Sequence, residues 1–214
     1  MIKTQAKGIA AEMLDWGFHI VAALLAGFFI ITFIGQLSIV KKTSMFPTLK
    51  EGDVVIVDKL TPRLTGYHRG DIVTIADAHP ALQGEVLIKR LIAMGGDTLE
   101  FYEGKVILNG LELKESYLAG VSTAPPGTPP LSPENKGYYR VRVPEGMVYV
   151  MGDNRQTGGS FDSRDFGPVP ARNITSRAFI RIYPLSRIQV FHVPEDVFQT
   201  GEKAMENTSG PAVN

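Results

Sequence analysis

A serine and a lysine stand out because the local pattern around each does not require a reactive side chain. Ser44 lies in the segment Thr43–Leu49 (TSMFPTL), which is also compatible with a simple turn whose hydroxyls bond locally. Lys89 interrupts the apolar run of Glu85–Asp97 (EVLIKRLIAMGGD). A serine hydroxyl becomes an effective nucleophile when a neighbouring base takes its proton, and a neutral lysine can be that base. The two residues are therefore candidates for covalent hydrolytic chemistry.

The alternation of a β-strand gives Lys89 apolar neighbours. Successive side chains of a strand point to opposite faces, which places Lys89 on one face with Leu87, Leu91 and Ala93. Desolvation disfavours an ammonium group, so a lysine in such surroundings would have a lowered pKa and could act as a neutral base. The alternative is a lysine on an edge strand whose ammonium group reaches water.

A third segment, Gly152–Gly167 (GDNRQTGGSFDSRDFG), is dense in hydrogen-bonding groups. Asp162 and Arg164 can form a charge-assisted pair that fixes this loop, which leaves the hydroxyls of Ser160 and Ser163 to orient a neighbouring group. The alternative is a solvated loop with a surface salt bridge that contributes little to stability.

Composition excludes several other chemistries. Basic and acidic residues both number 22, so no overall charge favours nucleic acid as a partner. The chain of 214 residues has no cysteine, which removes disulfides, thiolate metal sites and cysteine nucleophiles. Its 4 histidines lack the short spacings typical of a metal site. We therefore expect neither a metal nor a cofactor.

The elements that must position these residues are predicted to be mainly β-strands. The expected fold is an antiparallel β domain over residues 36–198, either a sandwich or a partly open barrel. Asn109-Gly110 predicts a tight hairpin, because a type I′ turn needs positive φ at both central positions. Short runs of branched and aromatic residues mark seven strands: Asp53–Val57, Asp71–Ile75, Val86–Ile92, Val106–Leu108, Tyr138–Val143, Met147–Val150 and Ala178–Tyr183.

The N-terminal part of the chain is predicted to be a membrane anchor. Gly17–Gly35 contains no formal charge, and as a helix it would span roughly 28 Å, close to the thickness of a bilayer core. A buried core helix and a cleaved secretory signal are the alternatives. We expect residues 1–16 to precede a transmembrane helix over 17–35, an exposed proline-rich loop over 124–133, and a disordered tail over 199–214.

The three chemical segments, in this order after one apolar segment, resemble the sequence boxes of bacterial type I signal peptidases. These are membrane-bound serine endopeptidases with a Ser-Lys dyad. The matching residues are Ser44-Met45-Phe46-Pro47-Thr48-Leu49, then Lys89-Arg90 ahead of Gly95-Gly96-Asp97, then Gly152-Asp153-Asn154-Arg155, and finally Ser160, Asp162, Ser163 and Arg164.

The resemblance implies a role for each matched residue. Ser44 would be the acylated nucleophile, Lys89 the general base and Ser160 a residue that orients the lysine, while Asp162 and Arg164 would support the site. The antiparallel β catalytic domain would lie on the outer face of the cytoplasmic membrane. It would remove signal peptides from exported preproteins by cutting after an Ala-x-Ala type of motif.

Two departures accompany the resemblance. Lys42 stands two positions before the nucleophile, where the family often has Ser or Gly, and Gln156–Gly159 lengthens the loop before Ser160. We expect segments 37–42 and 85–88 to flank an extended peptide, with substrate contacts from Met45, Leu87 and Ile88.

The expected partners are exported preproteins and the lipid bilayer, with no nucleic acid and no obligatory protein partner. A specialised peptidase of the same group, maturing a pilin or a plasmid-transfer protein, is the first alternative function. The second alternative is an inactive, membrane-tethered domain that binds exported chains.

Overall fold

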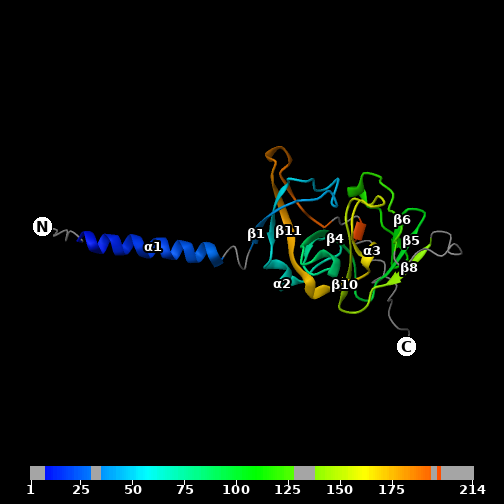
Figure 1. The fold of residues 1–214 in the computed structure, drawn as a ribbon, viewed down its shortest axis with the longest axis horizontal. Coiled ribbons are helices and arrows are strands. Elements are labelled where there is room, and N and C mark those ends of the chain that lie inside the picture. Colours follow the sequence, from blue (N-terminus) through cyan, green and yellow to red (C-terminus); the bar gives the residue numbers. More distant parts are fainter. Residues whose placement is uncertain (1–7, 30–34, 128–137, 194–196, 199–214) are drawn as a thin grey trace, which may run out of the picture.

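The computed structural model describes residues 8–29, 35–127, 138–193 and 197–198. Its long helix, α1, spans Ile9–Phe29, and Figure 1 shows it extending away from the β-rich part of the chain. No helix within the described ranges combines the length and apolar character needed to cross a membrane. The transmembrane helix predicted over 17–35 is therefore not confirmed. Its boundaries also differ: α1 begins before Gly17, residues 30–34 lie outside the described part, and Gly35 begins a strand.

The larger sheet contains eight strands, whose hydrogen-bonding order is β1-β2-β11-β3-β4-β9-β10, with β12 beside β11. Every pairing in it is antiparallel. Register shifts interrupt the pairing of β11 with β2 and β3, and that of β4 with β9, and such bulges increase strand bending and twist. The strands are β1 Gly35–Ile39, β2 Val54–Asp58, β3 Ile72–Ile75, β4 Leu87–Met94, β9 Met147–Met151, β10 Val169–Pro170, β11 Ile174–Tyr183 and β12 Gln189–Val190.

The smaller sheet has the order β7-β6-β5-β8, and Figure 1 shows β5, β6 and β8 grouped at one end of the β-rich part. Its strands are β5 Thr98–Tyr102, β6 Lys105–Leu108, β7 Leu111–Glu112 and β8 Tyr139–Arg142. The predicted hairpin joins β6 to β7. Asn109 has φ 52° and Gly110 has φ 83°, as a type I′ turn requires.

Short helical segments connect the strands. The α-helical ones are α2 Thr61–Thr65 and α3 Ser163–Phe166, and the 3₁₀ turns are η2 Pro80–Leu82, η3 Ser116–Leu118, η5 Ala171–Asn173 and η6 Leu185–Arg187. Asp162 caps α3: its side chain accepts a hydrogen bond from the Arg164 N–H, while the Asp165 carboxylate accepts one from the Asp162 N–H. This capping box fixes the loop that carries the third chemical segment.

The prediction of a mainly antiparallel β fold is confirmed, and each of the seven predicted runs contains a strand: β2, β3, β4, β6, β8, β9 and β11. Strand β5 was missed although its pattern alternates clearly, with Leu99 and Phe101 buried on either side of Glu100. The predicted proline-rich loop falls partly outside the described residues, because 128–137 are not among them. The predicted disordered tail over 199–214 lies wholly outside them.

Candidate active site

The loop that carries Ser44 is anchored in the hydrophobic core. Met45 and Leu49 are both completely buried, in a cluster with Val55 and Ile72 of the larger sheet. The Leu49 N–H donates to the Met45 carbonyl at 2.8 Å, which closes a helical turn. Two buried anchors around one turn therefore fix the backbone on which Ser44 sits.

Lys89 lies on a central strand. β4 pairs with β3 on one side and with β9 on the other, and Lys89 is opposite Val73 of β3. Only 2% of Lys89 is exposed, so the alternative of an edge-strand lysine reaching water is wrong. Burial lowers the pKa of Lys89 to about 8, even though the nearby Asp162 carboxylate acts in the opposite direction.

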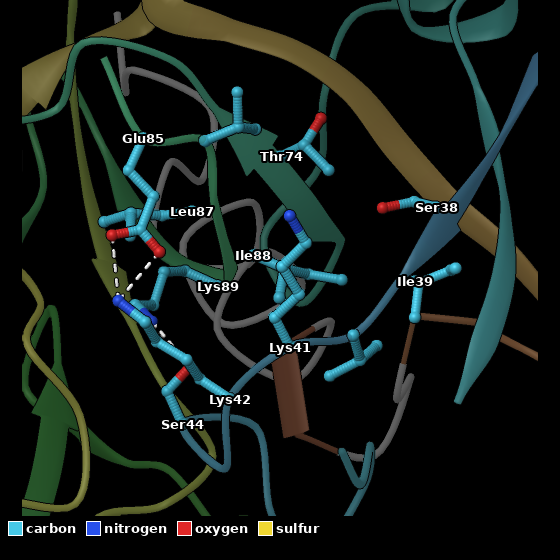
Figure 2. A pocket seen from close by; sticks show the side chains of 12 residues that line it. Ser38, Ile39, Lys41, Lys42, Ser44, Thr74, Glu85, Leu87, Ile88 and Lys89 are labelled. Atoms are coloured by element: carbon cyan, nitrogen blue, oxygen red, sulfur yellow. Dashed lines mark hydrogen bonds and ion pairs between the residues drawn. The ribbon is translucent and has the colours of Figure 1, made fainter. Parts of the chain in front are cut away.

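The structure brings the two candidate reactive groups into contact. Nζ of Lys89 donates a hydrogen bond to Oγ of Ser44 at 2.7 Å. This distance lies within the range for proton transfer between a base and a nucleophile. Figure 2 shows Lys89 and Ser44 meeting from different segments.

The alternation predicted for the lysine strand is wrong at its far end. The register of β4 with β9 shifts between Leu91 and Ala93, and Ala93 packs in the same core cluster as Ile92. Leu91 belongs to another cluster, with Val73 and Ile75. The bulge disrupts the period of two, whereas the pairing of β4 with β3 has no register shift between Leu87 and Lys89.

Asp162 and Arg164 form the predicted pair, and the alternative of a weak surface salt bridge is wrong because both side chains are buried. Nε of Arg164 donates to Oδ1 of Asp162 at 2.9 Å and Nη2 donates to Oδ2 at 2.8 Å. Gly152 N–H donates to the same carboxylate at 2.8 Å. Burial would raise the pKa of Asp162, but the Arg164 guanidinium and the Gly152 N–H together lower it below its usual value.

Ser160 is the residue that the resemblance implies would orient Lys89. It lines one cavity together with Ser44 and Lys89. Its Oγ is buried and forms no hydrogen bond to Lys89. It lies close enough to the Asp162 carboxylate to contribute to the lowered pKa of Asp162. Gly152 is packed tightly here, since a Cβ added to it would lie 2.3 Å from both the Ser160 Oγ and the Ser44 carbonyl oxygen.

A cavity of about 370 Å³ opens beside Ser44 and Lys89. One wall comes from residues 38–42 and the other from residues 85–89, close to the two segments expected to flank a peptide. Figure 2 shows Leu87 and Ile88 among the lining side chains. Met45 differs from this expectation: its side chain lies in the core beneath the loop, because the turn that presents Ser44 directs the next side chain inward.

Sequence reasoning missed a second buried network, which ties the Ser44 loop to β4. Arg90 donates to both oxygens of Asp153, from Nε at 2.9 Å and from Nη2 at 2.6 Å. Thr48 of the Ser44 loop donates to the same carboxylate at 2.5 Å. Arg90 follows Lys89 in the sequence, so a charged residue next to the lysine was the available signal.

Arg155 was missed as well. It is completely buried, and its Nη1 donates to Oε2 of Glu115 at 2.7 Å and to Oγ1 of Thr123 at 2.9 Å. Its Nε donates to the Gly152 carbonyl at 2.8 Å. This ion pair links the loop after β7 to the segment around Gly152. No local pattern predicts it, because 40 positions separate its partners.

Together, the curved antiparallel sheet and the contact between Ser44 and Lys89 define a site suited to hydrolysis through a serine nucleophile. The family model described as "Signal peptidase, peptidase S26" matches residues 13–183. Because this match covers most of the sequence, the chain belongs to the peptidase S26 family of signal peptidases. It is therefore a serine endopeptidase of that family, and family membership supports a function in the removal of signal peptides.

Curated relatives agree with this assignment. The probable signal peptidase I-2 of Synechocystis sp. (strain ATCC 27184 / PCC 6803 / Kazusa) is 35% identical over 82% of this chain and 75% of its own. Signal peptidase I of Leptolyngbya laminosa is 33% identical over 73% of both chains. A solved structure of a signal peptidase I from Enterococcus faecalis V583 is 30% identical, with a TM-score of 0.40, and the match covers 52% of this chain and 95% of that one.

Proposed function

We propose that this protein removes signal peptides from exported preproteins, with Ser44 as the nucleophile and Lys89 as the general base. The observation that carries the proposal is the 2.7 Å contact between Oγ of Ser44 and a lysine that is only 2% exposed. A base must be neutral before it can accept a proton, and burial moves the lysine toward that state.

The proposed reaction has two halves. Neutral Lys89 takes the proton of Ser44 as its Oγ attacks the carbonyl carbon of the scissile peptide bond. The C–N bond then breaks, and the leaving amine takes the proton from the Lys89 ammonium group. This leaves the signal peptide as an ester on Ser44. Lys89 next takes a proton from water, the hydroxide attacks the ester carbonyl, and Ser44 regains its proton as the signal peptide leaves as a carboxylic acid.

The two walls of the cavity support a mode of peptide binding. An extended peptide lying between residues 38–42 and 85–88 would add to the outer edge of β1, the first strand in the order of the sheet, and to the start of β4, ahead of its pairing with β9. Leu87 and Ile88 lie on the wall beside Lys89, where they would contact the residues before the scissile bond. We propose that this part of the cavity accepts small side chains and therefore an Ala-x-Ala motif.

We also propose that segment 17–35 anchors the chain in the cell membrane, with the β domain on the outer face. The support is its lack of formal charge and the exposure of apolar side chains along α1, such as Leu24, Leu25 and Phe28. Reporter fusions after residue 198 test this topology. Fusions that are active only in the cytoplasm would overturn it.

Two precursors that differ only at the motif test the function directly. The purified full chain, in detergent micelles, is expected to cut a precursor whose signal peptide ends in Ala-x-Ala. It should spare one with a large aromatic residue in place of either alanine. Equal cleavage of both precursors would exclude the proposed specificity. A fluorophosphonate that labels wild type but not Ser44→Ala would establish the nucleophile separately, and an inactive binding domain would show neither result.

A specialised peptidase that matures a pilin or a plasmid-transfer protein would use the same residues. A panel of unrelated exported precursors distinguishes it from a general signal peptidase. The general enzyme is expected to process most members of the panel, whereas a specialised one would process a single class.

A further inference from the structure

An ion pair lies at the mouth of the cavity, next to the proposed nucleophile and base. Nζ of Lys42 is 2.7 Å from Oε1 of Glu85 and 2.8 Å from Oε2. Figure 2 shows the Glu85 carboxylate directed toward the Lys42 ammonium group, beside Ser44 and Lys89. Both partners also line the cavity.

The pair connects two segments that the sheet does not pair with each other. Lys42 follows β1, the first strand in the order of the larger sheet, and Glu85 precedes β4. Three strands, β2, β11 and β3, separate β1 from β4 in that order. The ion pair therefore joins the two walls of the cavity across its opening, at the end where Ser44 and Lys89 meet.

We propose that the Lys42–Glu85 ion pair is a positioning element of the active site, which holds the wall that carries the nucleophile against the wall that carries the base. This inference rests on the proposed function. It also gives a role to Lys42, at the position where the resemblance to type I signal peptidases leads us to expect Ser or Gly.

The positions of the positive and the negative charge within the pair also affect the pKa of Lys89. Burial is the main cause of the lowered pKa of Lys89, and four charged groups then act on it: Asp162 and Glu85 raise the pKa, while Lys42 and Arg164 lower it. Lys42 has a larger effect than Glu85, so the pair as it stands favours the neutral base. Reversing the pair would favour the charged form.

The exposure of the pair makes the inference testable without loss of the fold. The side chains of Lys42 and Glu85 are 63% and 40% exposed, and ion pairs in such positions contribute little to stability. Charge-reversed variants should therefore fold like wild type. A change in their kinetics can then be assigned to the site.

The test uses the full chain in detergent micelles and a soluble peptide that contains Ala-x-Ala. Lys42→Glu, Glu85→Lys and the double exchange are compared with wild type. The exposed pair of Lys105 and Glu112 provides a matched control, because its partners lie 3.0 Å apart on the smaller sheet. Each single reversal at the mouth is expected to raise KM by about fivefold, and the double exchange should return KM to within about twofold of wild type. Lys105→Glu should change neither KM nor kcat.

The pH dependence separates this role from a purely structural one. Lys42→Glu should move the acidic limb of kcat/KM to higher pH, and Glu85→Lys should move it to lower pH. The same shifts are expected in the titration of Lys89 followed by NMR of ¹³C-labelled lysine, which needs no activity. The inference would be overturned if the increases in KM of the two single variants simply added in the double exchange. An unchanged Lys89 titration in both single variants would overturn it as well. Failure of wild type to cut the peptide would instead count against the proposed function, and the NMR arm would still decide the role of the pair.

Discussion

Nζ of Lys89 lies 2.7 Å from Oγ of Ser44, although 45 positions separate the two residues in the chain. The contact forms because β4 places the lysine in the interior of the larger sheet, while Met45 and Leu49 fix the serine loop against the same core. Buried groups on both sides hold this geometry, so the proposed dyad is preorganised before substrate arrives.

Removing either member of the proposed dyad should abolish turnover. Lys89→Arg keeps the positive charge but cannot deprotonate in the working range, so it should lose at least about 10³-fold in kcat, as should Ser44→Ala. The double variant should lose little more than either single variant, because the two groups act as one unit. Peptide cleavage by purified, folded variants measures this. Lys114→Arg, at an exposed position, is the control. A Lys89→Arg variant that kept a tenth of the wild-type turnover would exclude Lys89 as the base.

Activity should rise with pH as Lys89 loses its proton. Burial lowers the pKa of this lysine to about 8, so the active fraction grows through that pH and is small at pH 6. The acidic limb of kcat/KM against pH, measured with a soluble peptide, should have its midpoint near this value. A midpoint near pH 6 would instead point to a histidine as the base.

The lowered pKa also predicts a cost in stability. Lys89 has a pKa of about 8 in the folded chain, against 10.5 for an ordinary lysine, so the folded state binds its proton less tightly. The destabilisation caused by burying the charged lysine is present in full below pH 8. It disappears as the pH rises toward 10.5. Lys89→Met should therefore be more stable than wild type at pH 7, by on the order of 1–3 kcal/mol. Chemical denaturation should show the difference shrinking by pH 10, and a constant difference would contradict the assignment.

Gly152 should tolerate no side chain. A Cβ there would lie 2.3 Å from the Ser44 carbonyl oxygen, which is a backbone atom of the nucleophile loop. Gly152→Ala should displace Ser44 from Lys89 and lower kcat by about 10²-fold, since a misplacement near 1 Å has effects of this size. Gly127→Ala is the control, because its added Cβ meets nothing within 4 Å. Wild-type kinetics in Gly152→Ala would show that the loop can move without harm.

The buried pair of Glu115 and Arg155 should be important for folding. Removing one partner leaves an uncompensated buried charge, so Glu115→Ala should lower the free energy of unfolding by about 3–5 kcal/mol. Glu112→Ala removes one partner of an exposed pair and should cost less than about 1 kcal/mol. Urea denaturation of both variants makes the comparison, and equal effects would contradict the structural role of the buried pair.

Patterns that repeat over a few residues were sufficient to predict the antiparallel β fold and the Asn109-Gly110 hairpin. Strand periodicity and turn chemistry are local properties, so they can be followed directly along the chain. Ser44 and Lys89 stood out as candidates from their local surroundings, but their proposed roles came from the resemblance of three ordered segments to type I signal peptidases. The ion pair of Asp162 and Arg164 could be predicted because the two residues are neighbours in sequence.

Only the tertiary structure decided how these groups meet and what surrounds them. The bulge in β4 moved Ala93 away from the predicted face, and packing placed Met45 in the core rather than in the cavity. The pairs Lys42–Glu85 and Arg155–Glu115 join residues 43 and 40 positions apart. Contacts between residues so far apart in the sequence depend on how the sheet curls. The same packing decides which side chains are shielded from water, and burial sets the pKa of a lysine more strongly than its sequence neighbours do. Sequence therefore supplied the chemical groups, and folding supplied the distances and the desolvation on which their proposed reactivity depends.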